Sequence, residues 1–206
     1  GLYFFYWEWV TFDEIRPCIG CCVACIHRVL ALERGSCVVN PSVGREYLLK
    51  NCLRAEVSKR VLVAGGGPAG MAFARSATLR GHQVILLEEK KETGGVAGLA
   101  SLPPGRSEVA DIISYFQRQL ILLNVEIRTG TRLTADLIKE IQPEIVVVAT
   151  GGLPAIPVIK GLSKTGLQML TVLDVLEGSE TAGAHVVVIG GGQAALLVAD
   201  YLAERG

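Results

Sequence analysis

The sequence predicts an α/β fold built on a parallel sheet, preceded by an irregular cysteine-rich segment and followed by the start of a second unit of the same kind. Three observations lead to this prediction. From Arg60 onward, continuous runs of Val, Ile and Leu alternate with helical patterns, as in sheets that are covered on both faces. Clustered glycines directly follow two of these runs. Five of the six cysteines lie between Cys18 and Cys37, in a stretch with little periodicity.

Composition excludes several classes of protein. Half of the 206 residues are apolar and 19% are charged, which is enough for a hydrophobic core in one or two domains. The 20 Lys and Arg residues balance the 20 Asp and Glu residues, so nucleic acid is not an expected partner. No apolar run reaches the roughly 18 residues of a membrane span, and no signal peptide is evident. A cytoplasmic protein that neither enters nor crosses a membrane is therefore expected.

A β-α-β pattern begins at Arg60. The strand RVLVA is followed by the glycine turn GGGPAG, an alanine-rich helix to about Arg80 and the strand QVILLE. A longer amphipathic helix is expected from about Ser107 to Leu123, and after the short strand VEIR a further helix should begin with Thr134 as its N-cap. The run EIVVVAT then predicts another buried strand.

A second module is expected after the prolines of LPAIPVI, which break any helix beyond Gly152. The chain there repeats a strand, a glycine turn and a helix in HVVVIGGGQAALLVADYLAERG. Because the sequence stops after this β-α pair, we expect it to be an internal piece of a longer protein. The second unit would then lack the strand whose acidic or basic residue selects NAD or NADP.

The cysteine-rich segment has the spacing C-x2-C-x3-C-x11-C. Close spacing lets three thiolates face one inorganic cluster while the fourth arrives from a loop, and soft sulfur suits iron-sulfide centres. Four cysteines with a leading C-x2-C could equally close a structural zinc site, or could simply be buried. The candidate metal ligands are Cys18, Cys21, Cys25 and Cys37.

A glycine fingerprint, G-x-G-x-x-G, follows the first strand directly and opens the first helix, as in Rossmann-like dinucleotide-binding folds. The first glycine permits the sharp turn, the second lets backbone approach a pyrophosphate, and the third allows close packing of helix on strand. The helix N-terminus favours the negative charge of the phosphates. Alone, the motif leaves FAD, NAD and S-adenosylmethionine open. The candidate binding residues are Gly65, Gly67, Pro68, Ala69 and Gly70.

Three further features accompany this fingerprint. Glu88 ends the second strand, where an acidic side chain can accept hydrogen bonds from ribose hydroxyls. Gly94 and Gly95 follow it in an E-x5-G-G arrangement that resembles FAD-binding two-dinucleotide flavoproteins, so that FAD is preferred over NAD here. An A-T-G element after EIVVV resembles the end of another strand of such FAD domains, near the exit into a nicotinamide domain. It comprises Ala149, Thr150 and Gly151.

A second fingerprint, GGGQAA, again follows an apolar strand and opens a helix, and alanine is an accepted last residue. The two fingerprints in this order look like an FAD domain with an NAD(P)-binding domain inserted into it. The alternative is a glycine-rich turn without a ligand. The candidate residues are Gly190, Gly192, Gln193, Ala194 and Ala195.

Together with these motifs, the run RPCIGCCVACIHRVLALERGSCVVNP resembles the 2,4-dienoyl-CoA reductase and trimethylamine dehydrogenase group of NADH:flavin oxidoreductases. The resemblance implies a 4Fe-4S segment and linker at 1–57, the first half of an FAD-binding domain at 58–156 and the truncated start of an NAD(P)-binding domain at 157–206. It makes Cys22 a non-ligand, because the dienoyl-CoA reductase branch usually has a polar residue there.

The same resemblance implies that electrons pass from NAD(P)H through FAD and the cluster to FMN. The FMN would lie in a barrel domain upstream, which would also bind the small-molecule substrate. No residue of this chain is therefore expected to be catalytic toward substrate, and the chain alone should not oxidise NAD(P)H at a useful rate. Two alternatives remain open: the electron-delivering subunit of a glutamate-synthase-like complex, and a non-enzymatic, zinc-stapled nucleotide-binding module.

Overall fold

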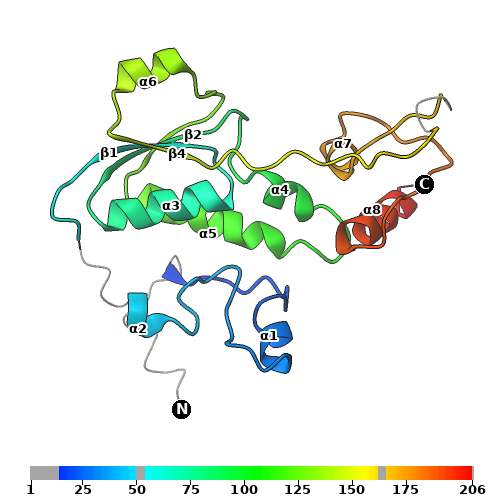
Figure 1. Cartoon of the computed structure of the whole chain (residues 1–206), viewed down its shortest axis with the longest axis horizontal. Coiled ribbons are helices and arrows are strands. Elements are labelled where there is room, and N and C mark those ends of the chain that lie inside the picture. The colour runs from blue at the N-terminus through cyan, green and yellow to red at the C-terminus, as the bar shows by residue number, and fades with distance from the viewer. Residues whose placement is uncertain (1–13, 50–53, 162–165, 206) are drawn as a thin grey trace.

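The centre of the molecule is a four-stranded sheet in the order β3-β2-β1-β4 (Figure 1). The computed structural model describes residues 14–49, 54–161 and 166–205. All neighbouring strands in the sheet are parallel, which confirms the predicted fold class. The strands are β1 (Arg60–Ala64), β2 (Gln83–Leu87), β3 (Glu126–Arg128) and β4 (Ile145–Val148).

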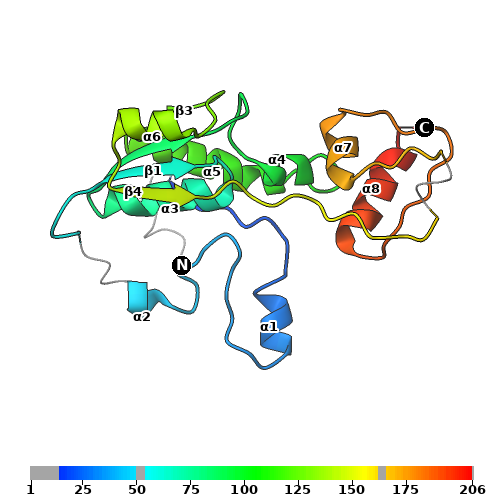
Figure 2. The same ribbon diagram turned by 45° about the horizontal axis from the view of Figure 1, so that its top comes forward.

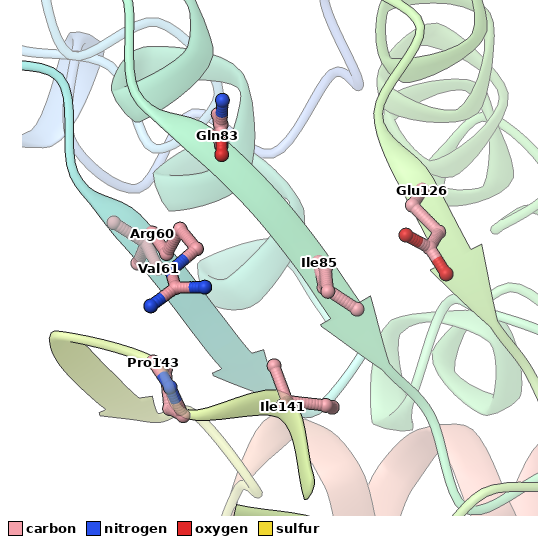
Figure 3. Close-up of a pocket in the computed structure, with 7 residues that line it drawn as sticks. All are labelled: Arg60, Val61, Gln83, Ile85, Glu126, Ile141 and Pro143. Carbon is pink, nitrogen blue, oxygen red and sulfur yellow. The ribbon is translucent and has the colours of Figure 1, made fainter.

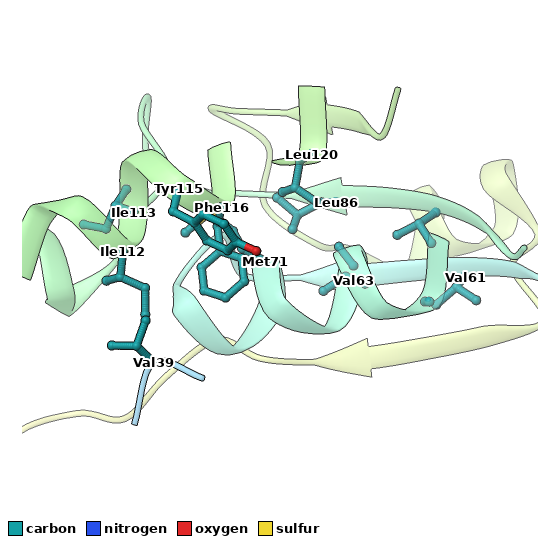
Figure 4. Packing of buried hydrophobic residues seen from close by; sticks show 13 residues of the cluster. Val39, Val61, Val63, Met71, Leu86, Ile112, Ile113, Tyr115, Phe116 and Leu120 are labelled. Carbon is teal, nitrogen blue, oxygen red and sulfur yellow. The ribbon is translucent and has the colours of Figure 1, made fainter. Parts of the chain in front are cut away.

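Helices lie on both sides of this sheet (Figures 1 and 2). Two of them, α3 (Pro68–Leu79) and α5 (Val109–Leu122), pack on one face, whereas the shorter α6 (Ala135–Ile141) lies on the other. The main hydrophobic core fills the space between the sheet and α3 and α5 (Figure 4). Its fully buried members include Val63, Met71, Leu86 and Leu120.

The elements expected between Arg60 and Thr150 are all present. Helix α5 is shorter than the expected span of Ser107 to Leu123 by two residues at its start and one at its end. The Thr134 side chain caps α6, because its oxygen accepts a hydrogen bond from the backbone N–H of Leu137 at 3.2 Å. The prediction of a buried strand from EIVVVAT is wrong in one respect: β4 is an edge strand, and Ile145, Val146 and Val148 are exposed. Helix α6 likewise has no buried residue.

The cysteine-rich segment is attached to this body through α5. It contains two short helices, α1 (Ile26–Leu30) and α2 (Glu46–Leu49), and is otherwise irregular. Arg16 donates hydrogen bonds to the Val39 carbonyl oxygen at 3.1 Å and to the Tyr115 hydroxyl at 3.3 Å. Val39 itself is buried in the main core.

The C-terminal part forms a small cluster of helices beyond the end of the sheet (Figures 1 and 2). Helix α4 (Val96–Ala100) contacts α7 (Val172–Glu177), which packs against α8 (Gln193–Ala203). Leu176, Val198 and Tyr201 make its buried centre.

The prediction of a strand at 185–189 is wrong, because the structure has no strand there. Val186, Val187, Val188 and Ile189 are exposed instead, since no neighbouring strand in the described chain offers them a ladder. Across 14–49, 54–161 and 166–205, no helix combines the length and apolar character needed to traverse a lipid bilayer.

Candidate cofactor site

The first glycine fingerprint forms the turn between β1 and α3, and two of its glycines are required by the packing of the protein itself. Gly65 has a φ of +108°, and a Cβ atom there would lie 2.2 Å from the Ala149 carbonyl oxygen. A Cβ atom on Gly70 would lie 1.9 Å from the Gly65 carbonyl oxygen. Both distances are far below van der Waals contact, so only glycine permits this close approach of helix, strand and turn.

Gly67 differs, because nothing in the protein demands a glycine there. Its backbone is extended, with φ −73° and ψ 176°, and no atom lies within 4 Å of a Cβ built on it. Gly67 is the N-cap of α3. Pro68 follows at the start of the helix, where the missing N–H of proline costs no helical hydrogen bond. Because no side chain fills the space beside Gly67, a phosphate could approach the helix N-terminus there and accept hydrogen bonds from its backbone N–H groups.

Glu88 lies at the end of β2 with its carboxylate against this turn. One oxygen, Oε2, accepts a hydrogen bond from the Gly66 N–H at 2.6 Å, and Oε1 accepts one from the Lys90 N–H at 2.9 Å. The residue is 8% exposed. A carboxylate has about four acceptor positions, so capacity remains for the hydroxyls of a ribose.

The other two predicted elements join the same turn. The Gly94 N–H donates to the Gly66 carbonyl oxygen at 2.9 Å, and a Cβ atom on Gly95 would lie 3.2 Å from the Gly67 Cα. The Ala149 N–H donates to the Ala64 carbonyl oxygen at 2.8 Å, which places the A-T-G element beside the end of β1. The structure therefore brings the fingerprint, the acidic residue, the glycine pair and the A-T-G element together at the carboxyl ends of the strands, where open α/β sheets bind ligands.

Thr93 also belongs to this site, although the sequence analysis did not identify it. Its methyl carbon would lie 2.8 Å from a Cβ atom on Gly66. Its hydroxyl accepts a hydrogen bond from the Gln117 side chain at 2.9 Å, so that α5 holds the loop after β2 in place. No motif predicts this contact, since it joins residues 24 positions apart through side chains alone.

The second fingerprint lies apart from the first, at the start of α8 (Figure 1). Gly192 is its N-cap and, like Gly67, has extended backbone and no atom within 4 Å of a built Cβ. Gly190 has a φ of +131°. The loop keeps the turn and helix of a dinucleotide site but has no strand in front of it.

The four candidate metal ligands lie in one segment around α1. Cys25 is the N-cap of that helix, and the Ser36 N–H donates to the Ala24 carbonyl oxygen at 3.1 Å, which brings the chain before Cys37 next to the chain before Cys25. Cys18 and Cys25 are exposed, Cys21 and Cys37 are half-buried, and all four are free thiols. Within the described ranges, no three His, Cys, Asp or Glu side chains converge as the ligands of a single metal ion do. A zinc site, which needs sulfurs about 2.3 Å from one point, is not preformed.

A separate cavity of about 160 Å³ lies on the sheet but away from these elements (Figure 3). Arg60 and Gln83 begin β1 and β2, so the cavity is at the amino ends of the strands. The glycine loop is at the opposite ends. This hollow is therefore not part of the candidate cofactor site.

Comparison with known proteins matches residues 59–206 to the pyridine nucleotide-disulphide oxidoreductase family. The NADH oxidase of Thermoanaerobacter brockii is 42% identical over 94% of this chain and 30% of that protein. The metal reductase of Desulforamulus reducens is 37% identical over 94% of this chain and 29% of that protein.

A solved structure of a 2-naphthoyl-CoA reductase superposes with a TM-score of 0.86 and 36% identity, covering 94% of this chain and 29% of that one. The chain thus spans about 30% of the length of the relatives it matches.

Proposed function

Because the chain belongs to the pyridine nucleotide-disulphide oxidoreductase family, we propose that it is the electron-transfer part of an FAD-dependent NAD(P)H oxidoreductase that also holds a 4Fe-4S cluster. The observation that supports this most directly is Gly67, the fingerprint glycine that packing leaves uncovered. Close packing within the protein requires glycine at positions 65 and 70, whereas a bound ligand would account for the glycine at position 67. FAD, when bound, accepts two electrons together from NAD(P)H and can release them singly.

The residues around Gly67 fit FAD. The N-terminus of α3 with Gly67, Pro68 and Ala69 would receive the pyrophosphate, and Glu88 would accept hydrogen bonds from the ribose of the adenosine half. Gly95 lies beside Gly67, and the Thr150 backbone lies beside Gly65. These groups bind and orient; none of them is proposed to transfer a proton.

NAD(P)H is assigned to the start of α8. Gly192 and the following N–H groups of Gln193 and Ala194 present the second phosphate-binding turn, and the Ala195 N–H closes it by donating to the Gly192 carbonyl oxygen at 3.0 Å. Three relatives that match this chain over 94% of its length carry names that refer to different substrates: NADH oxidase, metal reductase and 2-naphthoyl-CoA reductase. The shared part therefore serves electron supply, and we propose that substrate is bound by an FMN-containing barrel domain outside it.

The cluster is assigned to Cys18, Cys21, Cys25 and Cys37, which are free thiols on one irregular segment. A cubane cluster separates its ligand sulfurs by its own width, so its thiolates need not meet at one point as zinc ligands do. Cys22 stays a non-ligand in this proposal. Its backbone is left-handed, with a φ of +51°, directly after Cys21.

The flavin site is tested by a matched pair of variants, Gly67→Val and Gly192→Val. Both glycines are extended N-cap residues with open surroundings, so neither substitution strains the fold. Gly67→Val should lose the flavin absorbance of the purified protein while its thermal midpoint without flavin stays unchanged. Gly192→Val is compared with the parent in the full-length protein, because this chain alone is not expected to oxidise NAD(P)H at a useful rate. It should keep the flavin and lose NAD(P)H-dependent flavin reduction. Equal flavin content in the parent and Gly67→Val would contradict the proposal.

The cluster is tested by anaerobic reconstitution followed by iron and acid-labile sulfide analysis. Cys37→Ser should lose the iron and keep the flavin, whereas Cys22→Ser should keep both. Stoichiometric zinc without sulfide would refute the cluster, and so would its loss from Cys22→Ser alone.

A further inference from the structure

A cavity of about 370 Å³ lies between the cysteine segment and the start of α5. One wall belongs to the chain around the first candidate ligand, and the other belongs to the turn that leads into α5. Its lining residues are Cys18, Ile19, Gly20, Gly105, Arg106, Glu108 and Val109. The charged side chains that line it are thus one arginine and one glutamate, on the wall that faces Cys18.

The segment that carries Cys18 is joined to α5 by contacts that do not depend on a metal. Arg16, two residues before Cys18, donates to the Val39 carbonyl oxygen and to the Asn40 Oδ1 atom, each at 3.1 Å. Its guanidinium carbon also lies 5.0 Å from the ring centroid of Tyr115 on α5. The chain two residues before Cys18 is therefore anchored on α5.

Arg106 lines this cavity, and the Nε–H of its guanidinium group donates no hydrogen bond within the described residues. Its backbone is fixed in the turn, because its N–H donates to the Pro103 carbonyl oxygen at 3.2 Å and its own carbonyl oxygen accepts from the Val109 N–H at 3.0 Å. Its Nε atom is buried, and no hydrogen-bond partner for it occurs in the described part of the chain. A buried guanidinium N–H without a partner is unfavourable unless a ligand supplies an acceptor.

We infer that Arg106 acts as the charge partner of the cluster at Cys18 and raises its reduction potential, with Glu108 acting in the opposite sense. The inference rests on the proposed function, in which Cys18 is a cluster ligand. Four thiolates give the cluster a net negative charge that grows by one when it accepts an electron, without uptake of a proton. A neighbouring cation stabilises the reduced state more than the oxidised state, and an anion does the reverse. Net charge near a cluster is one of the levers that set its potential.

The test is a potentiometric titration of the reconstituted chain, with the reduced cluster followed by EPR. Arg106→Gln should lower the ratio of reduced to oxidised cluster at a fixed potential about tenfold, which corresponds to about 59 mV for a one-electron couple. Arg106→Lys keeps the charge and should restore most of the ratio. Glu108→Gln should shift the ratio in the opposite direction from Arg106→Gln.

Arg132→Gln is the matched control, because Arg132 is an exposed arginine on the loop that leads from β3 into α6. Helix α6 lies across the sheet from α1 (Figure 1). It should leave the potential unchanged. A fully loaded Arg106→Gln protein with the parent's potential would overturn the inference and leave the proposed function intact. If Arg106→Gln does not hold a cluster, Glu108→Gln decides, and an unchanged or lowered potential overturns the inference. A parent chain that takes up no iron and sulfide would refute the proposed cluster and this inference together.

Discussion

The two glycine fingerprints of this chain share a sequence pattern, but only the first is preceded by a strand in the structure. In the first, strand β1 is paired on both sides, by β2 and β4, and Val63 is fully buried at 0% exposure. In the second, the corresponding run from Val186 to Ile189 forms no strand, and Val187 is 86% exposed. The helix that follows is present in both cases.

This difference shows which parts of a dinucleotide motif are local. The extended N-cap glycine and the helix after it form from nearby residues, so they appear at Gly67 and at Gly192 alike. The strand needs neighbours, because its backbone groups and both faces must be satisfied by other elements. A fingerprint therefore predicts a turn and a helix directly, whereas the sheet around it depends on the rest of the domain.

Amide hydrogen exchange should reveal the largest contrast between the two regions. Amides of β1, such as those of Leu62 and Val63, lie within the sheet and should open only with global unfolding, whereas those of 186–189 lack ladder partners in the described chain. We expect exchange rates that differ by at least about a thousandfold, given ordinary domain stability. Comparable protection at both strands would show that the second run is paired in solution.

A matched pair of glycine variants should give the next largest effect. Gly65→Ala places a methyl group 2.2 Å from the Ala149 carbonyl oxygen at a positive φ, and should cost at least about 3 kcal/mol in the free energy of unfolding. Gly190→Ala also has a positive φ, but its nearest contact is 3.7 Å away, and it should cost about 1 kcal/mol. Urea denaturation measures both. Equal losses would mean that the second turn is as tightly packed as the first.

Valine truncation tests burial rather than backbone strain. Val63→Ala removes buried methyl groups from the main core and should cost about 2 kcal/mol. Val187→Ala removes exposed ones and should change stability by less than about 0.5 kcal/mol. The comparison fails if Val187→Ala destabilises the protein as much as Val63→Ala does.

The same distinction between local and distant partners explains what could be predicted from the sequence. The parallel sheet, α3, α5, the Thr134 cap and the gathering of Glu88, Gly94 and Ala149 around the first fingerprint follow from periodicity, caps and motif order. The signals for the helices and the Thr134 cap lie within a few residues of the features that they predict, whereas the gathering around the first fingerprint follows from the order of the motifs along a parallel sheet.

The remaining features depend on contacts between distant side chains. The clamp from Arg16 to Tyr115 joins residues 99 positions apart, and no pattern indicates the cavity between Cys18 and Arg106. Helix α7 was also missed, although Thr171 and Asp174 form a capping box at its start. The box has aspartate in place of the usual glutamate or glutamine, and the helix is only six residues long, so its signal is weak.

The ion pair between Lys90 and Glu177 links the first region to α7, and its contribution should be small. Both side chains are well exposed, at 60% and 36%, so solvent screens their attraction. A double-mutant cycle with Lys90→Ala and Glu177→Ala should give a coupling of about 0.5 kcal/mol at low salt. The coupling should vanish near 1 M salt, where the Debye length is about 3 Å. The Lys139–Asp136 pair within α6 provides a control that cannot link the two regions. A coupling that salt does not change would indicate a direct packing contact instead.

The capping box of α7 should make the stability of this helix weakly dependent on pH in the acid range. The Thr171 hydroxyl, and then the Thr171 backbone N–H, donate to the Asp174 carboxylate, and these bonds lower the pKa of Asp174. A carboxyl group whose folded pKa is depressed contributes its stabilisation fully above its unfolded pKa and loses it as the pH falls through the folded value. The helix should therefore begin to fray below roughly pH 4, while the first region remains unchanged.

The measurement is an NMR pH titration of the α7 amides, with β1 amides as the internal reference. Asp174→Asn should remove the pH dependence and leave α7 equally frayed at all pH values. Thr171→Ala should reduce the dependence without abolishing it, because the backbone N–H still bonds the carboxylate, and should destabilise the helix by roughly 1 kcal/mol at neutral pH. If the β1 and α7 amides instead lose protection together as the pH falls, the two parts unfold as one unit, and the prediction of a local response at α7 is wrong.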